Sequence, residues 1–283
     1  MKPGLVATSH VPARGVTAPA PIPGAASRSI APLLGGSPAP AQILGVSSVG
    51  AWLRLGGHVI VLSGPGPARL PNGIAIGGSD PAYPHPDESC IVGEGRLAFA
   101  DTEIDIVRWW DPRPTLQPVT AESLVAAADD LRSLLTCPGL EPLASALGER
   151  DVVAVRRAMR DLLGSGPGLT PQGDDVLVGV LAGLRLLRPA VGSTWSASML
   201  HTIAPFIEAE APRRTTSLSV SLLHHAVAGE VAAPVASLLQ ALTGRGELNA
   251  AVARLRGMGA TSGVAMGCGG LVAVDALTRD GDR

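Results

Sequence analysis

The spacing of apolar residues changes along this chain at about residue 112. Before that point apolar residues occur in short runs separated by Gly and Pro, which is typical of β-strands. The runs expected to form strands are Ile43–Leu55, His58–Leu62, Ile74–Ile76, Ser89–Val92, Leu97–Ala100 and Ile104–Val107. Gly56–Gly57 separates the first two runs and predicts a hairpin there. Short strands at this spacing predict a small sandwich or barrel.

Beyond residue 112 the apolar residues recur with the 3.6-residue period of helices. The predicted helices are Ser123–Leu135, Asp151–Leu163, Asp174–Leu187, Ser196–Glu210, Arg214–Ala228, Ala233–Leu242, Leu248–Leu255 and Ser262–Leu277. Residues 1–41 are rich in Pro and Ala, and prolines at this density favour extended coil. The sequence therefore predicts an α+β protein with an N-terminal segment at 1–41, a strand-rich domain at 42–112 and a mostly helical domain at 113–283.

The most unusual stretch runs from residue 164 to 183 and reads GSGPGLTPQGDDVLVGVLAG. It begins as a loop of Gly and Pro and continues as an apolar helix, with Asp174 or Asp175 expected at the N-cap. Such a loop can direct several backbone N–H groups at one point, where a helix N-terminus adds positive potential. We expect a phosphate, carboxylate or oxyanion to bind there, although a tight turn capped by Asp is the simpler alternative. The aspartate that does not cap the helix could accept a proton, bind a metal or orient a substrate amide.

Two further helix starts carry groups that can bind anions. One is Arg213–Ser217, which follows Pro212, and the other is the small-residue turn Gly259–Gly263. Guanidinium groups, hydroxyls and helix N–H groups together can hold a phosphate or carboxylate. N-capping by Thr beside two surface arginines is the alternative for the first of them. We expect the helix starts near residues 174, 214 and 262 to converge on one pocket.

The segment GPGLTPQGDD at residues 166–175 resembles the AllH family, which is associated with oxamate carbamoyltransferase. Weaker resemblance extends over residues 42–278 and includes Trp110–Arg113. The resemblance implies a transferase subunit that acts on oxalurate, oxamate and carbamoyl phosphate together with partner subunits. It implies catalytic roles for Asp174, Asp175 and Thr170. The substrate- or anion-binding residues that we expect are Gly166, Gly168, Leu169, Gly173, Arg213, Arg214, Thr215, Thr216, Thr261, Ser262 and Gly263.

The chain departs from the family pattern at two positions. The resemblance implies a His at the position of Ala260 and an Asp at about the position of Ala265, and this chain has neither. These departures favour a non-catalytic subunit that binds a small anion or acts as a scaffold. A lone hydrolase or cyclase acting on a small amide or ureide is a third interpretation.

Composition limits the partners and cofactors. The net charge of −2 and an aromatic content of 2% argue against nucleic acid binding. No apolar run is long enough to cross a membrane and no secretory signal is evident, so we expect a cytoplasmic protein. Residues 1–79 carry basic but no acidic side chains, which could help to attract an anionic ligand. No nucleotide motif is present, and no cofactor is expected, with a divalent metal at Asp174 and Asp175 as the alternative.

Cysteine and histidine suggest no site of their own. Cys90, Cys137 and Cys268 are widely spaced, and we expect all three to be free, buried thiols. His224 and His225 are neighbours on a predicted helix and cannot share one face of it. One is expected to face the core and the other the solvent.

Overall fold

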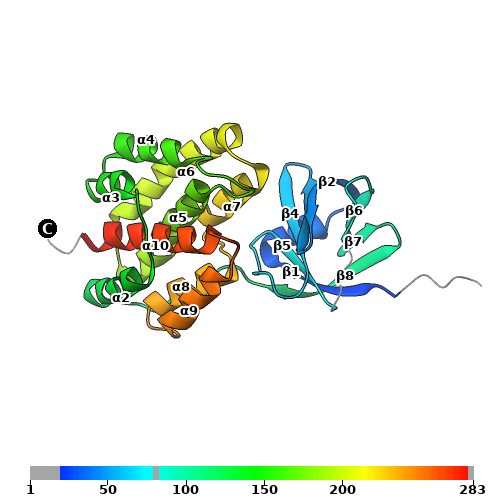
Figure 1. The fold of residues 1–283 in the computed structure, drawn as a ribbon, viewed down its shortest axis with the longest axis horizontal. Coiled ribbons are helices and arrows are strands. Elements are labelled where there is room, and N and C mark those ends of the chain that lie inside the picture. The colour runs from blue at the N-terminus through cyan, green and yellow to red at the C-terminus, as the bar shows by residue number, and fades with distance from the viewer. Residues whose placement is uncertain (1–19, 79–82, 280–283) are drawn as a thin grey trace, which may run out of the picture.

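The computed structural model describes residues 20–78 and 83–279. It has two lobes, a strand-rich lobe formed by the first part of the chain and a helical lobe formed by the rest (Figure 1). This arrangement confirms the predicted α+β class.

The strand-rich lobe is a closed barrel with the strand order β1-β5-β4-β3-β2-β6-β7-β8. Parallel pairing of β1 with β8 closes it, so no described strand is left with an unpaired edge. The strands are β1 (Ile22–Ser27), β2 (Ala39–Ser47), β3 (Gly50–Leu55), β4 (His58–Ser63), β5 (Gly73–Ile76), β6 (Cys90–Gly93), β7 (Arg96–Phe99) and β8 (Thr102–Trp110). The hairpin predicted at Gly56–Gly57 is confirmed, because Leu55 pairs with His58 across the β3–β4 turn. Gly56 takes a φ of 60° in this turn, a conformation that favours glycine.

The expectation of extended coil up to residue 41 is wrong for its described part. The barrel begins at Ile22, and a short 3-10 turn η1 (Arg28–Ile30) and helix α1 (Ala31–Leu34) follow β1. Ile30 and Leu34 are buried in the barrel core. The prolines did not prevent this because they occupy tolerated positions, Pro23 near the start of a strand and Pro32 in the first turn of a helix. Residues 1–19 lie outside the described residues.

The helical lobe is built around two crossing helices, α5 and α10, which lie at its centre in Figure 1. The helices are α2 (Ala121–Leu134), α3 (Glu141–Gly148), α4 (Val152–Leu162), α5 (Gln172–Val191), α6 (Trp195–Arg214), α7 (Ser217–Val227), α8 (Ala233–Leu242), α9 (Leu248–Arg256) and α10 (Ser262–Thr278). Helix α3 was not expected from the sequence. It is short and has a proline in its first turn, so its apolar period is hard to detect.

Glycines allow α5 and α10 to approach to backbone distance. A Cβ added at Gly179 would lie 2.0 Å from the carbonyl oxygen of Met266, and one at Gly269 would lie 2.0 Å from that of Val176. Both glycines therefore serve helix packing. The contact fixes the start of α5 against the start of α10.

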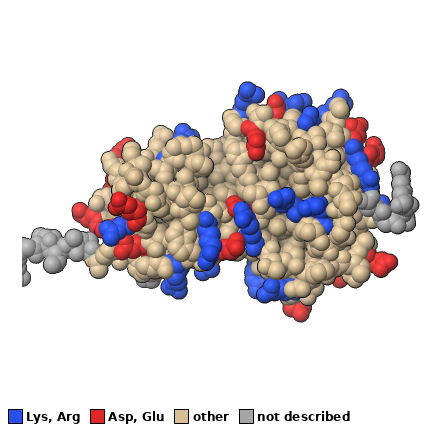
Figure 2. Space-filling view, turned by 180° about the vertical axis from the view of Figure 1, so that it is seen from behind, with Lys and Arg blue, Asp and Glu red and all other residues tan. Residues whose placement is uncertain are grey.

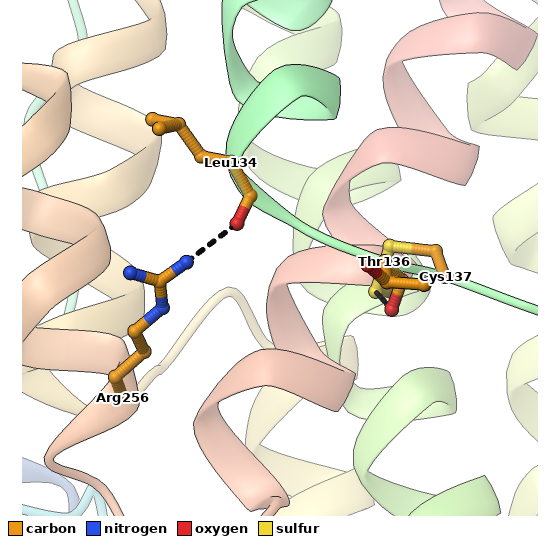
Figure 3. Close-up of a disulfide and its surroundings, with 5 residues drawn as sticks. Leu134, Thr136, Cys137 and Arg256 are labelled. Carbon is orange, nitrogen blue, oxygen red and sulfur yellow. Dashed lines mark hydrogen bonds between the residues drawn. A yellow bond between two sulfur atoms is a disulfide. The ribbon is translucent and has the colours of Figure 1, made fainter.

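The prediction of three free thiols is wrong for two of them. Cys137 and Cys268 form a disulfide, whereas Cys90 is a free, buried thiol. Figure 3 shows this bond joining the segment after α2 to α10, with the Arg256 guanidinium donating nearby to the carbonyl oxygen of Leu134 at 2.7 Å. The two cysteines are 131 positions apart in sequence, and only the packing of α2 against α10 brings them together.

Charged side chains do not form a large patch of one sign on the face drawn in Figure 2, where acidic and basic groups are interspersed over both lobes. Among the described residues, no helix has the length and apolar character needed to cross a membrane.

Candidate functional site

The three helix starts expected to converge do lie together. The Thr216 hydroxyl, which caps α7, donates to the carbonyl oxygen of Leu169 at 2.6 Å. The hydroxyls of Thr170 and Ser262 are 3.0 Å apart and share a hydrogen bond. The Gly-rich loop ahead of α5 is therefore held at two adjacent residues near its end, one by the start of α7 and the other by the start of α10.

The side chain of Asp174 fixes the start of this loop through a hydrogen bond with its backbone. The expectation that Asp174 or Asp175 caps the helix is wrong, because α5 begins at Gln172 with Pro171 at the N-cap, and both aspartates lie in the first turn. Asp174 is 1% exposed. One of its carboxylate oxygens accepts the backbone N–H of Gly164 at 2.8 Å, and the other accepts the hydroxyl of Thr215. The negative charge near a helix N-terminus adds to this stabilisation.

Asp175 differs sharply from its neighbour. It is also 1% exposed, yet neither carboxylate oxygen has a hydrogen-bond partner of normal geometry among the described residues. Burial raises the pKa of Asp175 from its ordinary value of 3.8 to about 7. The nearby hydroxyls of Ser262 and Thr170 partly oppose this rise in pKa, and the charge of Asp174 adds to it. Asp175 can therefore exist in both protonation states near neutral pH.

Asp175 lies in the wall of a cavity of about 680 Å³ between the two lobes. Trp52, Val61 and Ser63 line it from the barrel, on strands β3 and β4. The helical lobe contributes Leu169, Thr170, Asp175, Leu218, Leu222, Met258, Ser262 and Met266. The described lining residues include no Arg, Lys or His. The cavity is therefore mostly apolar, with a carboxyl and two hydroxyls grouped on one wall.

The backbone N–H groups of the loop are only partly available to a ligand. Those of Gly164, Ser165 and Gly173 donate to acceptors within the protein. Within the part of the chain that the structure describes, those of Gly168, Leu169 and Thr170 have no acceptor. Gly166 and Gly168 have φ values of 102° and 104°, which favour glycine, and the loop is exposed at both.

Residues 162–274 match the family model described as oxamate carbamoyltransferase subunit AllH. This match confirms the resemblance carried by GPGLTPQGDD. No curated protein and no solved structure is significantly similar to the chain. The matched AllH segment runs from the end of α4 into α10, so it contains Asp174, Asp175, Thr170 and Ser262 but none of the barrel.

The two arginines expected to bind an anion, Arg213 and Arg214, do not occupy the predicted position. Arg213 and Arg214 are the last residues of α6, because that helix continues through Pro212 and α7 begins only at Ser217. Both are exposed, and the Arg214 guanidinium pairs with Glu210 at 2.9 Å. Neither lines the cavity beside Asp175.

Two glycines of the AllH segment have a packing role. A Cβ at Gly173 would lie 2.1 Å from the carbonyl oxygen of Leu162, and one at Gly263 would lie 1.9 Å from that of Leu255. The N–H of Gly263 donates to the carbonyl oxygen of Met258. Close backbone contact accounts for both glycines without a ligand.

The remaining positions that the sequence singled out do not line the cavity beside Asp175. Thr261 precedes α10, is exposed and makes no capping bond. Ala260 is exposed, whereas Ala265 is buried and lines a smaller cavity of about 280 Å³ beside the disulfide. Among the described residues, no group of three or more His, Cys, Asp or Glu side chains is placed to hold a metal. Both oxygens of Asp174 already accept hydrogen bonds, so a cation at the aspartate pair would rely on Asp175.

Sequence reasoning missed the barrel side of the cavity. Trp52 is one of four tryptophans in a chain with little aromatic content, and the Gly64–Pro67 turn has the same stiff composition as the loop at 164–171. These two features were the only signals in the sequence that we find for the barrel side of the cavity. Neither could show that the residues face Asp175, because the pairing of the two lobes depends on tertiary structure.

Proposed function

We propose that this chain is the AllH-type subunit of an oxamate carbamoyltransferase, in which Asp175 exchanges a proton with the substrate amide. The observation that carries the proposal is a buried carboxyl that faces a cavity, has no hydrogen-bond partner of normal geometry among the described residues, and has its pKa raised to about 7. General acid–base catalysis is most effective when the pKa of the group is close to the working pH. The family name matched by residues 162–274 supplies the reaction class.

In the proposed reaction, a phosphate oxygen attacks the terminal carbamoyl carbon of oxalurate. The bond from that carbon to the amide nitrogen breaks, and protonated Asp175 gives its proton to the departing nitrogen. The products are oxamate and carbamoyl phosphate. In the reverse direction the oxamate nitrogen attacks carbamoyl phosphate, phosphate leaves, and the Asp175 carboxylate takes the proton from nitrogen. Thr170 and Ser262 would orient the carboxyl through the hydroxyl pair beside it.

The loop would stabilise the charge that develops on the carbamoyl oxygen. Leu169 and Thr170 line the cavity, and their backbone N–H groups have no acceptor among the described residues. Preorganised N–H donors of this kind are the usual elements of an oxyanion hole. We assign no role in this cavity to Arg213 or Arg214, which lie outside it.

Partner subunits would complete the site. Oxalurate, oxamate and phosphate are anions, and the described lining of the cavity carries no cation to pair with them. Burying an anion beside a carboxylate without a cation is costly. The word "subunit" in the family description supports a hetero-oligomer, in which a neighbouring chain would supply the basic groups.

A non-catalytic subunit that binds a small molecule is the second candidate. It is favoured by the apolar lining and by Ala260 and Ala265, where the resemblance to the family implies a His and an Asp. In that case Asp175 would hydrogen bond to a ligand without transferring a proton.

The test is phosphorolysis of oxalurate by the assembled complex, measured as carbamoyl phosphate formed. We expect Asp175→Asn to lower kcat by about 100-fold or more, the usual contribution of a general acid. Asp161→Asn, on the exposed face of α4, is the matched control and should leave kcat unchanged. Folding and assembly of each variant are checked by circular dichroism and gel filtration. An assembled Asp175→Asn complex with the wild-type rate would refute the role of Asp175.

A further inference from the structure

A second cavity lies between the lobes, of about 700 Å³ and separate from the one beside Asp175. It lies between the β3–β4 turn of the barrel and helix α7. The two cavities share no lining residue. We call it the histidine cleft and define it by Arg54, His58, Ser217, Ser221, His224 and His225.

The histidine cleft is rich in groups that can carry positive charge. It brings one arginine and three histidines together, and no Asp or Glu is among its described lining residues. Arg54 forms no ion pair within the described chain, and its guanidinium makes one long bond, of 3.4 Å, to the Ser217 hydroxyl. The guanidinium is therefore available to an anion, with a fork of N–H donors suited to phosphate.

Two acidic groups lie near the histidine cleft, and one of them already pairs with a histidine that lines it. The Glu230 carboxylate pairs with Arg113 at 2.5 Å and with the His225 imidazole at 2.6 Å. Burial lowers the pKa of His224. The charge of Glu208 opposes this change, whereas the neighbouring His225 and His58 add to it. An anion bound in the cleft would raise the pKa of His224, because it favours the protonated imidazole.

The histidine cleft also contains neutral hydrogen-bond donors, the hydroxyls of Ser217 and Ser221. The side-chain amide of buried Asn72 donates to the Ser221 oxygen at 3.1 Å, which leaves the Ser221 hydroxyl its own proton to donate. Ser217 is the first residue of α7, so its hydroxyl stands beside the positive end of that helix. The cleft thus combines charged and neutral donors on both lobes.

We propose that the histidine cleft binds the phosphate or diphosphate group of a small soluble molecule. Arg54, His58 and His224 would pair with the phosphate oxygens, and Ser217 and Ser221 would donate to them. A cavity of about 700 Å³ leaves room for the rest of the molecule beyond the phosphate group. The proposal does not depend on the reaction assigned to Asp175.

The test is calorimetric titration of the purified chain with inorganic pyrophosphate at constant ionic strength. We expect binding that tightens as the pH falls, because a bound phosphate favours the protonated form of His224, whose pKa burial lowers in the free protein. Arg54→Gln should weaken the affinity by about tenfold, the usual value of a charge-assisted hydrogen bond. His224→Asn should weaken the affinity and give a smaller change of affinity with pH than wild type shows over the same range.

Two control variants distinguish pyrophosphate binding in the histidine cleft from binding elsewhere on the protein. Arg213→Gln removes an exposed arginine outside the histidine cleft and should leave the affinity unchanged. Asp175→Asn should also leave it unchanged, so loss of the proposed function and loss of this site can be told apart. The proposal is overturned if pyrophosphate does not bind, if Arg54→Gln and His224→Asn bind as wild type, or if Arg213→Gln weakens binding as much as Arg54→Gln.

Discussion

The backbone N–H of Gly164 donates to the carboxylate of Asp174 at 2.8 Å, across the whole Gly-rich loop. This bond and the one from Thr215 use both oxygens of Asp174, whereas those of Asp175 have no partner of normal geometry in the described chain. Two adjacent residues of the same type therefore have different roles. Asp174 holds the loop in place, and Asp175 presents an ionisable group to the cavity.

Asp174→Asn should destabilise the fold. An amide in place of the carboxylate cannot accept both hydrogen bonds, so one buried donor is left unsatisfied. We expect the free energy of unfolding to fall by about 1–3 kcal/mol, measured by denaturant titration. Asp161→Asn, which is exposed, is the control and should stay within about 0.5 kcal/mol of wild type. Equal stability of the two variants would show that Asp174 does not hold the loop.

Asp175→Asn should stabilise the fold, and increasingly so as the pH rises. Asp175 keeps its proton up to about pH 7 when folded but releases it near pH 3.8 when unfolded. The folded state therefore binds more protons between these values, so Asp175 lowers stability as the pH rises through this window. The difference from Asp175→Asn should grow from near zero at pH 4 to on the order of 4 kcal/mol at pH 8. A difference that does not change with pH would count against the raised pKa.

The disulfide should contribute to stability and should be detectable by thiol counting. It links residues 131 positions apart, so the double variant Cys137→Ser, Cys268→Ser should lose about 2–5 kcal/mol. In denaturant without reductant, one thiol per chain should react, that of Cys90, and three should react after reduction. Three reactive thiols without reductant would contradict the bond.

The crossing of α5 and α10 should tolerate no side chain at its closest point. Gly179→Ala would place a Cβ 2.0 Å from the carbonyl oxygen of Met266, so the two helices must separate. We expect a loss of about 3 kcal/mol, the upper end of the usual cost of overpacking, in thermal or chemical unfolding. Gly57→Ala has no heavy atom within 4 Å of the new Cβ and should be close to neutral. Similar stability of the two variants would indicate that the helices do not cross at this distance.

The loop and the helix that follows it could be predicted because their signals are local. GPGLTPQGDD predicts a stiff turn leading into a helix, and the start of α5 lies within two residues of the expected position. The separate roles of the aspartates could not be predicted. They depend on Thr215, which is 41 positions away and reaches Asp174 only through the packing of α5 against α7.

The other differences between the sequence-based expectations and the structure also arise from packing between distant segments. Pro212 suggested a helix start, but tertiary packing carries α6 through it, and Arg213 and Arg214 consequently end one helix instead of opening the next. The Cys137–Cys268 bond and the barrel wall at Trp52 depend on contacts between distant segments. A sequence pattern records which residues can form an element, whereas a site formed by several elements depends on how they pack.

Titration of the Asp175 carboxyl itself tests its proposed role most directly. Carboxyl carbon resonances of wild type and Asp175→Asn, compared by NMR over a range of pH, identify the Asp175 signal by difference. We expect a midpoint near pH 7 for this signal. A midpoint near the ordinary value of 3.8 would contradict it, because Asp175 would then be ionised at neutral pH and would have no proton to give.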